Sequence, residues 1–127
     1  MKLIMLFESM TGANVKDCIS NEKLIFIIQE NEMGKAIGKN GVNVKRMENK
    51  LRKKIKLVEF TNNITEFVKN MIYPVEANDI VFDNGIVAIY GKDASAKAIL
   101  IGRERKNIEH LSDIVKRYFD FKEIKVV

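Results

Sequence analysis

The sequence predicts an α+β protein made of two similar halves, each a three-stranded sheet packed by helices. Three observations support this prediction. Helix-like and strand-like hydrophobic patterns alternate, the whole pattern recurs after 64 residues, and a glycine-containing turn occupies the same place in both copies. A chain of 127 residues also suits two very small domains. We therefore expect one domain in residues 1–61 and a second in residues 62–127.

The first half is expected to contain a helix, a hairpin, two helices separated by a turn, and a final strand. An apolar stripe predicts the first helix, and β-prone runs on either side of the polar residues 20–22 predict the hairpin. Apolar residues at i, i+3 and i+7 predict the helix after the turn. The expected ranges are helix Lys2–Met10, strands Val15–Ile19 and Leu24–Ile28, helix Val42–Arg52 and strand Ile55–Phe60.

The second half repeats this order. The Asn84-Gly85 pair is a strong hairpin signal between two strands. Pro74 helps to end the preceding helix, and Asp93 can cap the following one. The expected elements are helix Thr65–Ile72 with Asn62, Asn63 or Thr65 as its cap, strands Val75–Phe82 and Ile86–Tyr90, a helix from Asp93 to near Ile101, a helix through Ile108, Leu111 and Val115, and strand Phe121–Val127.

The turn between the two helices of the first half is the most informative part of the chain. Gly38 and Gly41 stand three residues apart, so the backbone can turn tightly and carries no Cβ at those two positions. A phosphate backbone can then lie against the turn, near the N-terminus of the following helix. This arrangement is typical of the turn with which a KH domain holds a nucleic acid. We call residues 38–41 the first turn.

Positive charge is concentrated around the first turn. The stretch Met33–Lys56, which we call the basic segment, has nine basic residues and one acid, Glu48. Its charge is +8, whereas the rest of the chain sums to −3. This distribution favours a polyanion such as nucleic acid as the partner. A solvated helix face is the alternative interpretation of such a segment.

A degenerate copy of the turn, the second turn, spans residues 102–105. Arg105 stands where the second glycine would be, and Glu104 places an acid at the tip. A Cβ and a carboxylate both oppose the close approach of a phosphate, although Arg103, Arg105 and Lys106 can compensate by their charge. Two interpretations stay open. The second turn binds RNA weakly, or it serves as a packing or protein contact.

The whole chain resembles the tandem KH module of the NusA family of transcription factors, in its short archaeal form. The residues that carry the resemblance are Leu6–Ala13, Asp17-Cys18 and Glu32–Arg46. The resemblance implies two tandem type II (prokaryotic-type) KH domains, the second with a degenerate turn. It also implies binding of single-stranded RNA and a role in transcription termination or antitermination. RNA polymerase and other transcription machinery are candidate partners.

About four nucleotides would cross the groove of such a domain. Phosphates would contact the glycines and the tip of the first turn, and bases would lie on aliphatic side chains. Val44 and Met33 are candidates for the groove or for the core. The predicted RNA-binding residues are Lys35, Ile37, Gly38, Lys39, Asn40, Gly41, Val42, Lys45 and Arg46 in the first half, and Gly102, Arg103, Arg105 and Lys106 in the second.

Other features favour a binding protein over an enzyme. His110 is the only histidine, no cluster has metal-ligand spacing, and residues 34–39 lack the spacing of a phosphate loop. We therefore expect no catalysis, no cofactor and no small-molecule substrate. No apolar run approaches the length of a membrane span. The single cysteine, Cys18, fits a reducing compartment, so we expect a cytoplasmic protein.

Two other functions compete with an RNA-binding transcription factor. One is a protein-interaction adaptor of transcription or ribosome assembly, in which RNA contact is secondary. The other is a helix-hairpin-helix DNA binder, which also places a glycine-containing turn between helices. The strands before and after each turn argue against the DNA binder.

Overall fold

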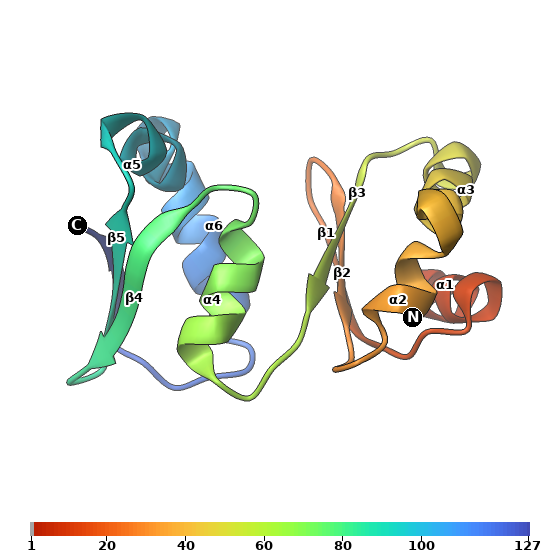
Figure 1. Ribbon diagram of the computed structural model, residues 1–127, viewed down its shortest axis with the longest axis horizontal. Helices are drawn as coiled ribbons and strands as arrows, with labels where there is room; N and C mark the ends of the chain where they lie inside the picture. Colours follow the sequence, from red (N-terminus) through yellow and green to blue (C-terminus); the bar gives the residue numbers. More distant parts are fainter. Residues whose placement is uncertain (1) are drawn as a thin grey trace. The chain divides into compact units, whose positions relative to one another are not determined.

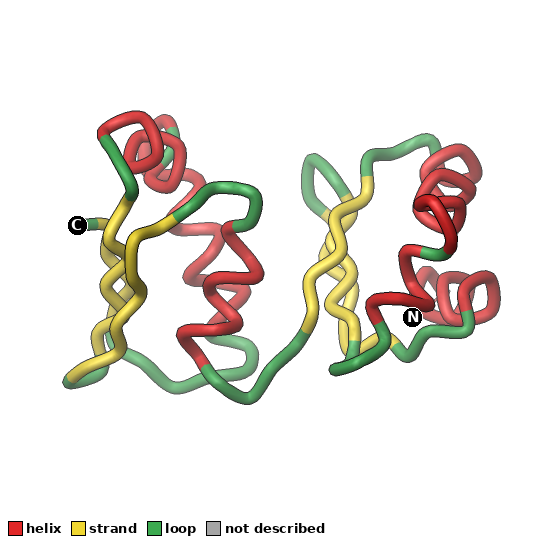
Figure 2. The backbone as a smooth tube through the Cα atoms, in the orientation of Figure 1, coloured by secondary structure: helices red, strands yellow, loops and turns green. Residues whose placement is uncertain are grey.

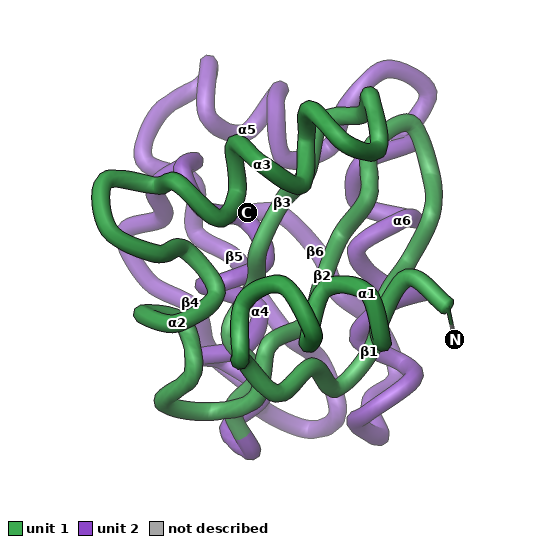
Figure 3. Tube along the Cα trace, turned by 90° about the vertical axis from the view of Figure 1, so that its right-hand side faces the viewer, with its two compact units in different colours: residues 1–61 green, residues 62–127 purple. Residues whose placement is uncertain are grey.

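In the computed structural model, which describes residues 2–127, the chain divides into two compact units. Unit 1 is Met1–Thr61 and unit 2 is Asn62–Val127 (Figure 3). Unit 1 contains α1 (Lys2–Thr11), β1 (Val15–Ser20), β2 (Leu24–Ile28), α2 (Met33–Ile37), the 3-10 turn η1 (Lys39–Gly41), α3 (Val42–Leu51) and β3 (Ile55–Glu59) (Figure 1). Unit 2 contains α4 (Ile64–Ile72), β4 (Ala77–Asp83), β5 (Ile86–Gly91), α5 (Ala94–Ile101), η2 (Arg103–Arg105), α6 (Lys106–Val115) and β6 (Glu123–Val126).

Both units have the same sheet topology. The strand orders are β1-β2-β3 and β4-β5-β6, with the first pair antiparallel and the second pair parallel in each sheet. The parallel pairs are joined through two helices and a turn, because a parallel connection needs a long crossover. The central strand β2 is buried along its whole length, which explains its uninterrupted apolar sequence. The predicted α+β class with two three-stranded sheets is confirmed.

The core of unit 1 lies between its sheet and its helices, which lie on one side of the sheet (Figure 2). The rings of Phe7 in α1 and Phe26 in β2 stack with centroids 4.4 Å apart, and both side chains are fully buried. Ala36 of α2 and Met47 of α3 are also fully buried in this cluster. The two helices that flank the first turn are therefore anchored to the sheet by their inner faces, which leaves the turn between them at the surface.

In unit 2, α4 and α6 cover one face of the sheet (Figure 1). Phe67 of α4 is fully buried and meets the Tyr118 ring edge-on at 5.6 Å. Of the three candidate caps, the structure selects Asn63, whose side chain accepts hydrogen bonds from the N–H groups of Thr65 and Glu66. An N-cap of this kind stabilises a helix by about 1 kcal/mol.

Two strands of unit 2 begin later than the sequence predicted. β4 begins at Ala77 because Val75 donates its N–H to the carbonyl of Ile72 and closes a turn after the helix. β6 begins at Glu123 because its partner strand β5 begins at Ile86, the residue that pairs with Glu123. Upstream of Glu123 the chain meets the hairpin turn instead of β5, since the N–H of Lys122 donates to the carbonyl of Gly85 at 2.6 Å.

Candidate nucleic-acid interface

The first turn links α2 to α3 through four residues, three of which have unusual backbone angles. Gly38 ends α2 with φ 75° and ψ 171°, a region open essentially to glycine alone. Asn40 and Gly41 follow in the left-handed region, at φ 57° and φ 73°. The N–H of Gly41 donates to the carbonyl of Gly38 at 3.1 Å and closes the turn. The sequence prediction of a tight glycine turn at this place is confirmed.

Gly38 and Gly41 are glycines for different reasons. A Cβ on Gly38 would lie 2.8 Å from Cγ of Asn43, closer than such atoms pack in proteins. A Cβ on Gly41 would meet no atom within 4 Å, so the space outside this residue is open. Only the left-handed backbone disfavours a side chain there, at a cost of about 1–2 kcal/mol. The open space at Gly41 is where another molecule can approach the backbone.

The polar and basic side chains predicted for the site are exposed. They come from α2, the turn and α3, which brings together residues that are up to eleven positions apart in the sequence. They are Lys35, Lys39, Asn40, Lys45 and Arg46. Long cationic side chains in this arrangement can attract and contact a phosphate backbone.

Two nearby carboxylates are engaged in backbone hydrogen bonds. Glu48, the one acid of the basic segment, accepts the N–H of Ile55 at 3.0 Å. Glu32 accepts the N–H of Asn14 at 2.9 Å and pairs with Lys35 at 3.4 Å. The Asn14 hydrogen bond, assisted by Lys35, holds the pKa of the Glu32 carboxyl below its ordinary value. Both carboxylates therefore stabilise loops of unit 1 beside the positive surface.

Aliphatic side chains border the first turn on both sides. Ile37 is 39% exposed and Val42 is 45% exposed, although both belong to helices with buried faces. Val44 is half-buried, and Met33 packs partly buried against the core of unit 1. Exposed aliphatic groups beside a cationic turn can receive the faces of nucleobases. Ile37 and Val42 are the two best placed to do so.

The second turn has the backbone of the first in spite of its different sequence. It also closes in the same way, with the N–H of Arg105 donating to the carbonyl of Gly102 at 3.1 Å. Gly102 has φ 76° and ψ 167°, close to the 75° and 171° of Gly38. Glu104 has φ 56° and ψ 29°, close to the 57° and 27° of Asn40. Arg105 has φ 63° and ψ 19°, close to the 73° and 17° of Gly41. The second copy is thus degenerate in its side chains and not in its backbone.

An asparagine supports both turns. Nδ2 of Asn43 donates to the carbonyl of Lys35 at 2.8 Å, and Nδ2 of Asn107 donates to the carbonyl of Ile99 at 2.7 Å. Each bond ties the helix after the turn to the last turn of the helix before it. Sequence analysis gave these residues no role, although the 64-residue repeat aligns Asn43 with Asn107. A polar residue retained at the same place in both copies was the available signal.

Comparison with known proteins identifies the family. Residues 3–62 match the sequence profile of the KH domain. A protein of Methanococcus vannielii called probable transcription termination protein NusA is 41% identical, over 98% of this chain and 74% of the relative. The protein of the same name in Halococcus morrhuae is 31% identical, over 97% of this chain and 91% of the relative. The chain belongs to the NusA family.

The NusA relationship extends over both units, whereas the KH profile covers the first. The NusA relative of Methanocaldococcus jannaschii is 31% identical over 95% of this chain and 68% of its own length. Among solved structures, that of a protein named APE1850 has a TM-score of 0.74 and 28% identity, over 99% of this chain and 96% of that chain. Unit 1 of this NusA-family chain is therefore a KH domain, with its turn at residues 38–41.

The candidate metal, cysteine and histidine sites gain no support from the structure of this member of the NusA family. Among residues 2–127, no group of three or more His, Cys, Asp or Glu side chains is arranged to hold a metal ion. Cys18 is half-buried in β1, and burial raises the pKa of its thiol, which makes it a poor nucleophile. His110 lies half-buried on α6. No helix in the described part of the chain has the length and apolar character needed to cross a bilayer.

Proposed function

We propose that this NusA-family chain binds single-stranded RNA at the first turn and acts in transcription termination or antitermination. One observation carries the proposal. The backbone at Gly41 faces open space and is flanked by the exposed side chains of Lys39 and Asn40. A phosphate can approach such a backbone without meeting a Cβ. The family's name, taken from relatives called probable transcription termination proteins, supports the second half of the proposal.

Each part of the site would hold a different part of the RNA. Lys39 and Asn40 at the tip would contact phosphate oxygens, and Lys35, Lys45 and Arg46 would add attraction at longer range. Bases of about four nucleotides would lie against Ile37 and Val42. Single-stranded RNA suits this site better than a duplex, because unstacked bases can reach aliphatic surface while the backbone stays on the turn.

For unit 2 we propose a second type II KH domain that makes a weaker RNA contact. Its element order, sheet topology and turn angles match those of unit 1, which supports the assignment. Arg103, Arg105 and Lys106 are exposed around the turn and can attract phosphate. Glu104 at the tip opposes this attraction, so we expect unit 2 to extend the binding of RNA and not to initiate it.

For this activity we propose a cytoplasmic location, together with the transcripts that the protein would bind. RNA polymerase or another part of the transcription machinery would be a second partner, since termination acts on an elongating polymerase. The proposed function needs no catalysis, cofactor or small-molecule substrate.

The experiment that tests the proposed function is a binding assay by fluorescence anisotropy. Labelled single-stranded RNA is compared with duplex RNA, single-stranded DNA and duplex DNA for the wild type and for Lys39→Asp/Asn40→Asp. The variant should bind single-stranded RNA at least about a hundredfold more weakly, because two charge-assisted contacts of about 1.5–3 kcal/mol each are lost. The affinity should also fall steeply with salt.

The chain offers a matched control for that variant. Asn49 and Lys50 are exposed near the end of α3, so Asn49→Asp/Lys50→Asp makes the same two replacements away from the turn. We expect this control to bind RNA within about threefold of the wild type, because loss of distant charge is screened by salt. Equal loss in both variants, or equal binding of every nucleic acid, would reject the first turn as the site and favour the adaptor function.

A further inference from the structure

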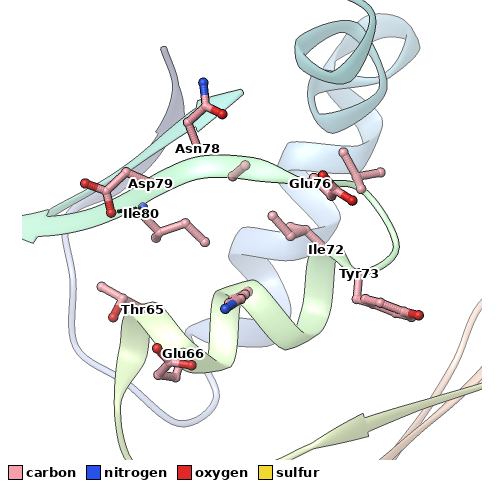
Figure 4. A pocket seen from close by; sticks show the side chains of 11 residues that line it. Thr65, Glu66, Ile72, Tyr73, Glu76, Asn78, Asp79 and Ile80 are labelled. Atoms are coloured by element: carbon pink, nitrogen blue, oxygen red, sulfur yellow. Dashed lines mark hydrogen bonds between the residues drawn. The ribbon is translucent and has the colours of Figure 1, made fainter. Parts of the chain in front are cut away.

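Unit 2 has a groove between α4 and β4, separate from its turn. The groove has a volume of about 410 Å³ and is lined by residues of α4, β4 and the loop between them. Ile72 and Ile80 point toward each other across the space between helix and strand, with Thr65 and Glu66 further along α4 (Figure 4). The groove therefore has apolar residues at its centre and polar residues along its rim.

The strand beside this groove is at the edge of its sheet. β4 pairs with β5 on one side only, and it is seven residues long. An edge strand has backbone N–H and C=O groups that can pair with a further strand. Near its start β4 is protected, because its register is irregular between Ala77 and Asp79 and the Asp79 carboxylate accepts the N–H of Ile80 at 2.9 Å. After this point β4 pairs regularly with β5 through to Asp83.

The second part of β4 also exposes apolar side chains. Val81 is 39% exposed and Phe82 is 42% exposed. Successive side chains of a strand point to opposite faces, so one apolar side chain is available on each face of the sheet next to the open edge. An exposed apolar edge of this kind is a site where a further strand is stabilised by pairing and by side-chain contact.

The charge around the groove is opposite to that of the first turn. The residues from Ile64 to Asp83 include four acids and a single basic residue, Lys69. The acids are Glu66, Glu76, Asp79 and Asp83. Glu76 pairs with Lys92 at 3.6 Å, which leaves three acids along α4 and β4 against Lys69, the basic residue that lines the groove. A surface with this charge disfavours RNA and favours a cationic partner.

We propose that β4 and the adjoining groove bind an extended, basic segment of a partner protein, which adds to the sheet as a fourth strand. Alternate side chains of the segment would enter the groove against Ile72 and Ile80. Lysine or arginine side chains would reach Glu66, Asp79 and Asp83. Backbone pairing with β4 would supply affinity, and the groove would select which side chains are accepted.

This site and the proposed RNA site use different elements. The second turn lies between α5 and α6, and α5 packs on β5 and β6, whereas the groove is formed by α4 and β4. The groove therefore shares no element with either turn. The inference goes beyond the proposed function and does not depend on it, since the groove and the first turn can be tested separately on the same chain.

The test uses synthetic peptides seven residues long, to match β4. Lysine alternates with Val, Leu, Ile, Phe or Thr in the panel, and a second panel replaces lysine by glutamate. Binding to the full chain is followed by the ¹⁵N–¹H spectrum. We expect saturable shifts confined to α4 and β4 with the lysine panel, and none with the glutamate panel. Absence of saturable binding by every lysine peptide, or shifts elsewhere in the chain, would overturn the proposal.

Two N-methylated forms of the best peptide test strand pairing directly. Methyl groups on one alternating set of backbone nitrogens face β4, and those on the other set face away from it. Strand addition predicts that one form loses binding and the other retains it. Equal binding of both forms would show that charge alone attracts the peptide, and would reject the fourth strand.

A pair of charge variants tests the location. The groove variant Glu66→Lys/Asp83→Lys changes two exposed acids, one that lines the groove and one at the end of β4. Glu109→Lys/Asp113→Lys makes the same change on the exposed face of α6. We expect the groove variant to weaken peptide binding about tenfold, and the α6 variant to change it less than about twofold. A cooperative thermal unfolding transition in each variant is the control for correct folding. Equal effects of the two variants would contradict the location. Self-association through β4, detected by sedimentation and lost in the groove variant, would assign the edge to a second copy instead.

Discussion

Asn43 and Gly38 are in such close contact that neither can be replaced without affecting the other. A Cβ on Gly38 would lie 2.8 Å from both Cγ and Nδ2 of Asn43, whose amide is held in place by its bond to the Lys35 carbonyl. Unit 2 repeats the arrangement, and a Cβ on Gly102 would lie 2.6 Å from Cγ of Asn107. The first glycine and the asparagine are common to both turns, whereas the second glycine is not. We infer that this pair maintains the shape of the turn.

Replacement of Asn43 by alanine should therefore weaken both folding and RNA binding. One hydrogen bond is lost, so the free energy of unfolding should fall by about 1 kcal/mol. RNA affinity should fall because α2 and α3 are no longer tied across the turn. Urea unfolding and anisotropy measure the two effects. Asn49→Ala is the control, since Asn49 is exposed on the same helix. Equal effects of the two replacements would contradict the role of Asn43.

The two glycines of the first turn should respond differently to alanine. Gly41→Ala should cost about 1–2 kcal/mol of stability, because only the left-handed backbone opposes it. Gly38→Ala should cost more, because the new Cβ also meets the Asn43 side chain. Gly41→Ala should nevertheless lower RNA affinity strongly, since its methyl group would occupy the open space. The free energy of unfolding and the RNA affinity of both variants, measured by urea unfolding and by RNA titration, test these two expectations. Unchanged RNA binding by folded Gly41→Ala would argue against backbone approach at that residue.

One replacement, Glu104→Asn, gives the tip of the second turn the residue that the first turn has at the same position. Glu104 and Asn40 have nearly the same backbone angles, so Glu104→Asn should be accepted without strain. Removal of a carboxylate near a phosphate should raise RNA affinity by about threefold to tenfold, on the basis of about 1 kcal/mol for two charges near 4 Å in water. The measurement is anisotropy with an RNA long enough to reach both units. No gain at low salt would indicate that the second turn does not face RNA.

The lowered pKa of Glu32 predicts a pH dependence of stability. A carboxyl whose pKa is lowered in the folded state contributes stability above its ordinary pKa of 4.5, and that contribution is lost as the pH falls through the folded value. The wild type should therefore be more stable than Glu32→Gln at neutral pH, with a difference that narrows below about pH 4.5. Urea midpoints of both proteins between about pH 7 and pH 3 test this. A difference that does not change with pH would contradict it.

Local patterns in the sequence determined the order of the elements. Apolar spacing along α1, α3 and α6 and the β-prone runs at β1, β2 and β5 depend on neighbours only a few residues away. The 64-residue repeat placed both turns, and the charge of the basic segment could be counted directly. These properties belong to short stretches of chain, so they can be recognised without knowing how the stretches pack.

Packing decided the features that depend on how one element meets another. Arg105 has the left-handed backbone of Gly41 because Gly102 and Asn107 maintain the turn around it, which no local propensity of arginine predicts. Glu48 became a hydrogen-bond acceptor for β3 only when α3 and that strand met. The groove between α4 and β4 likewise exists only in the folded unit. Each of these depends on the distance and angle between elements, which are set by the core and not by the order of residues along one element.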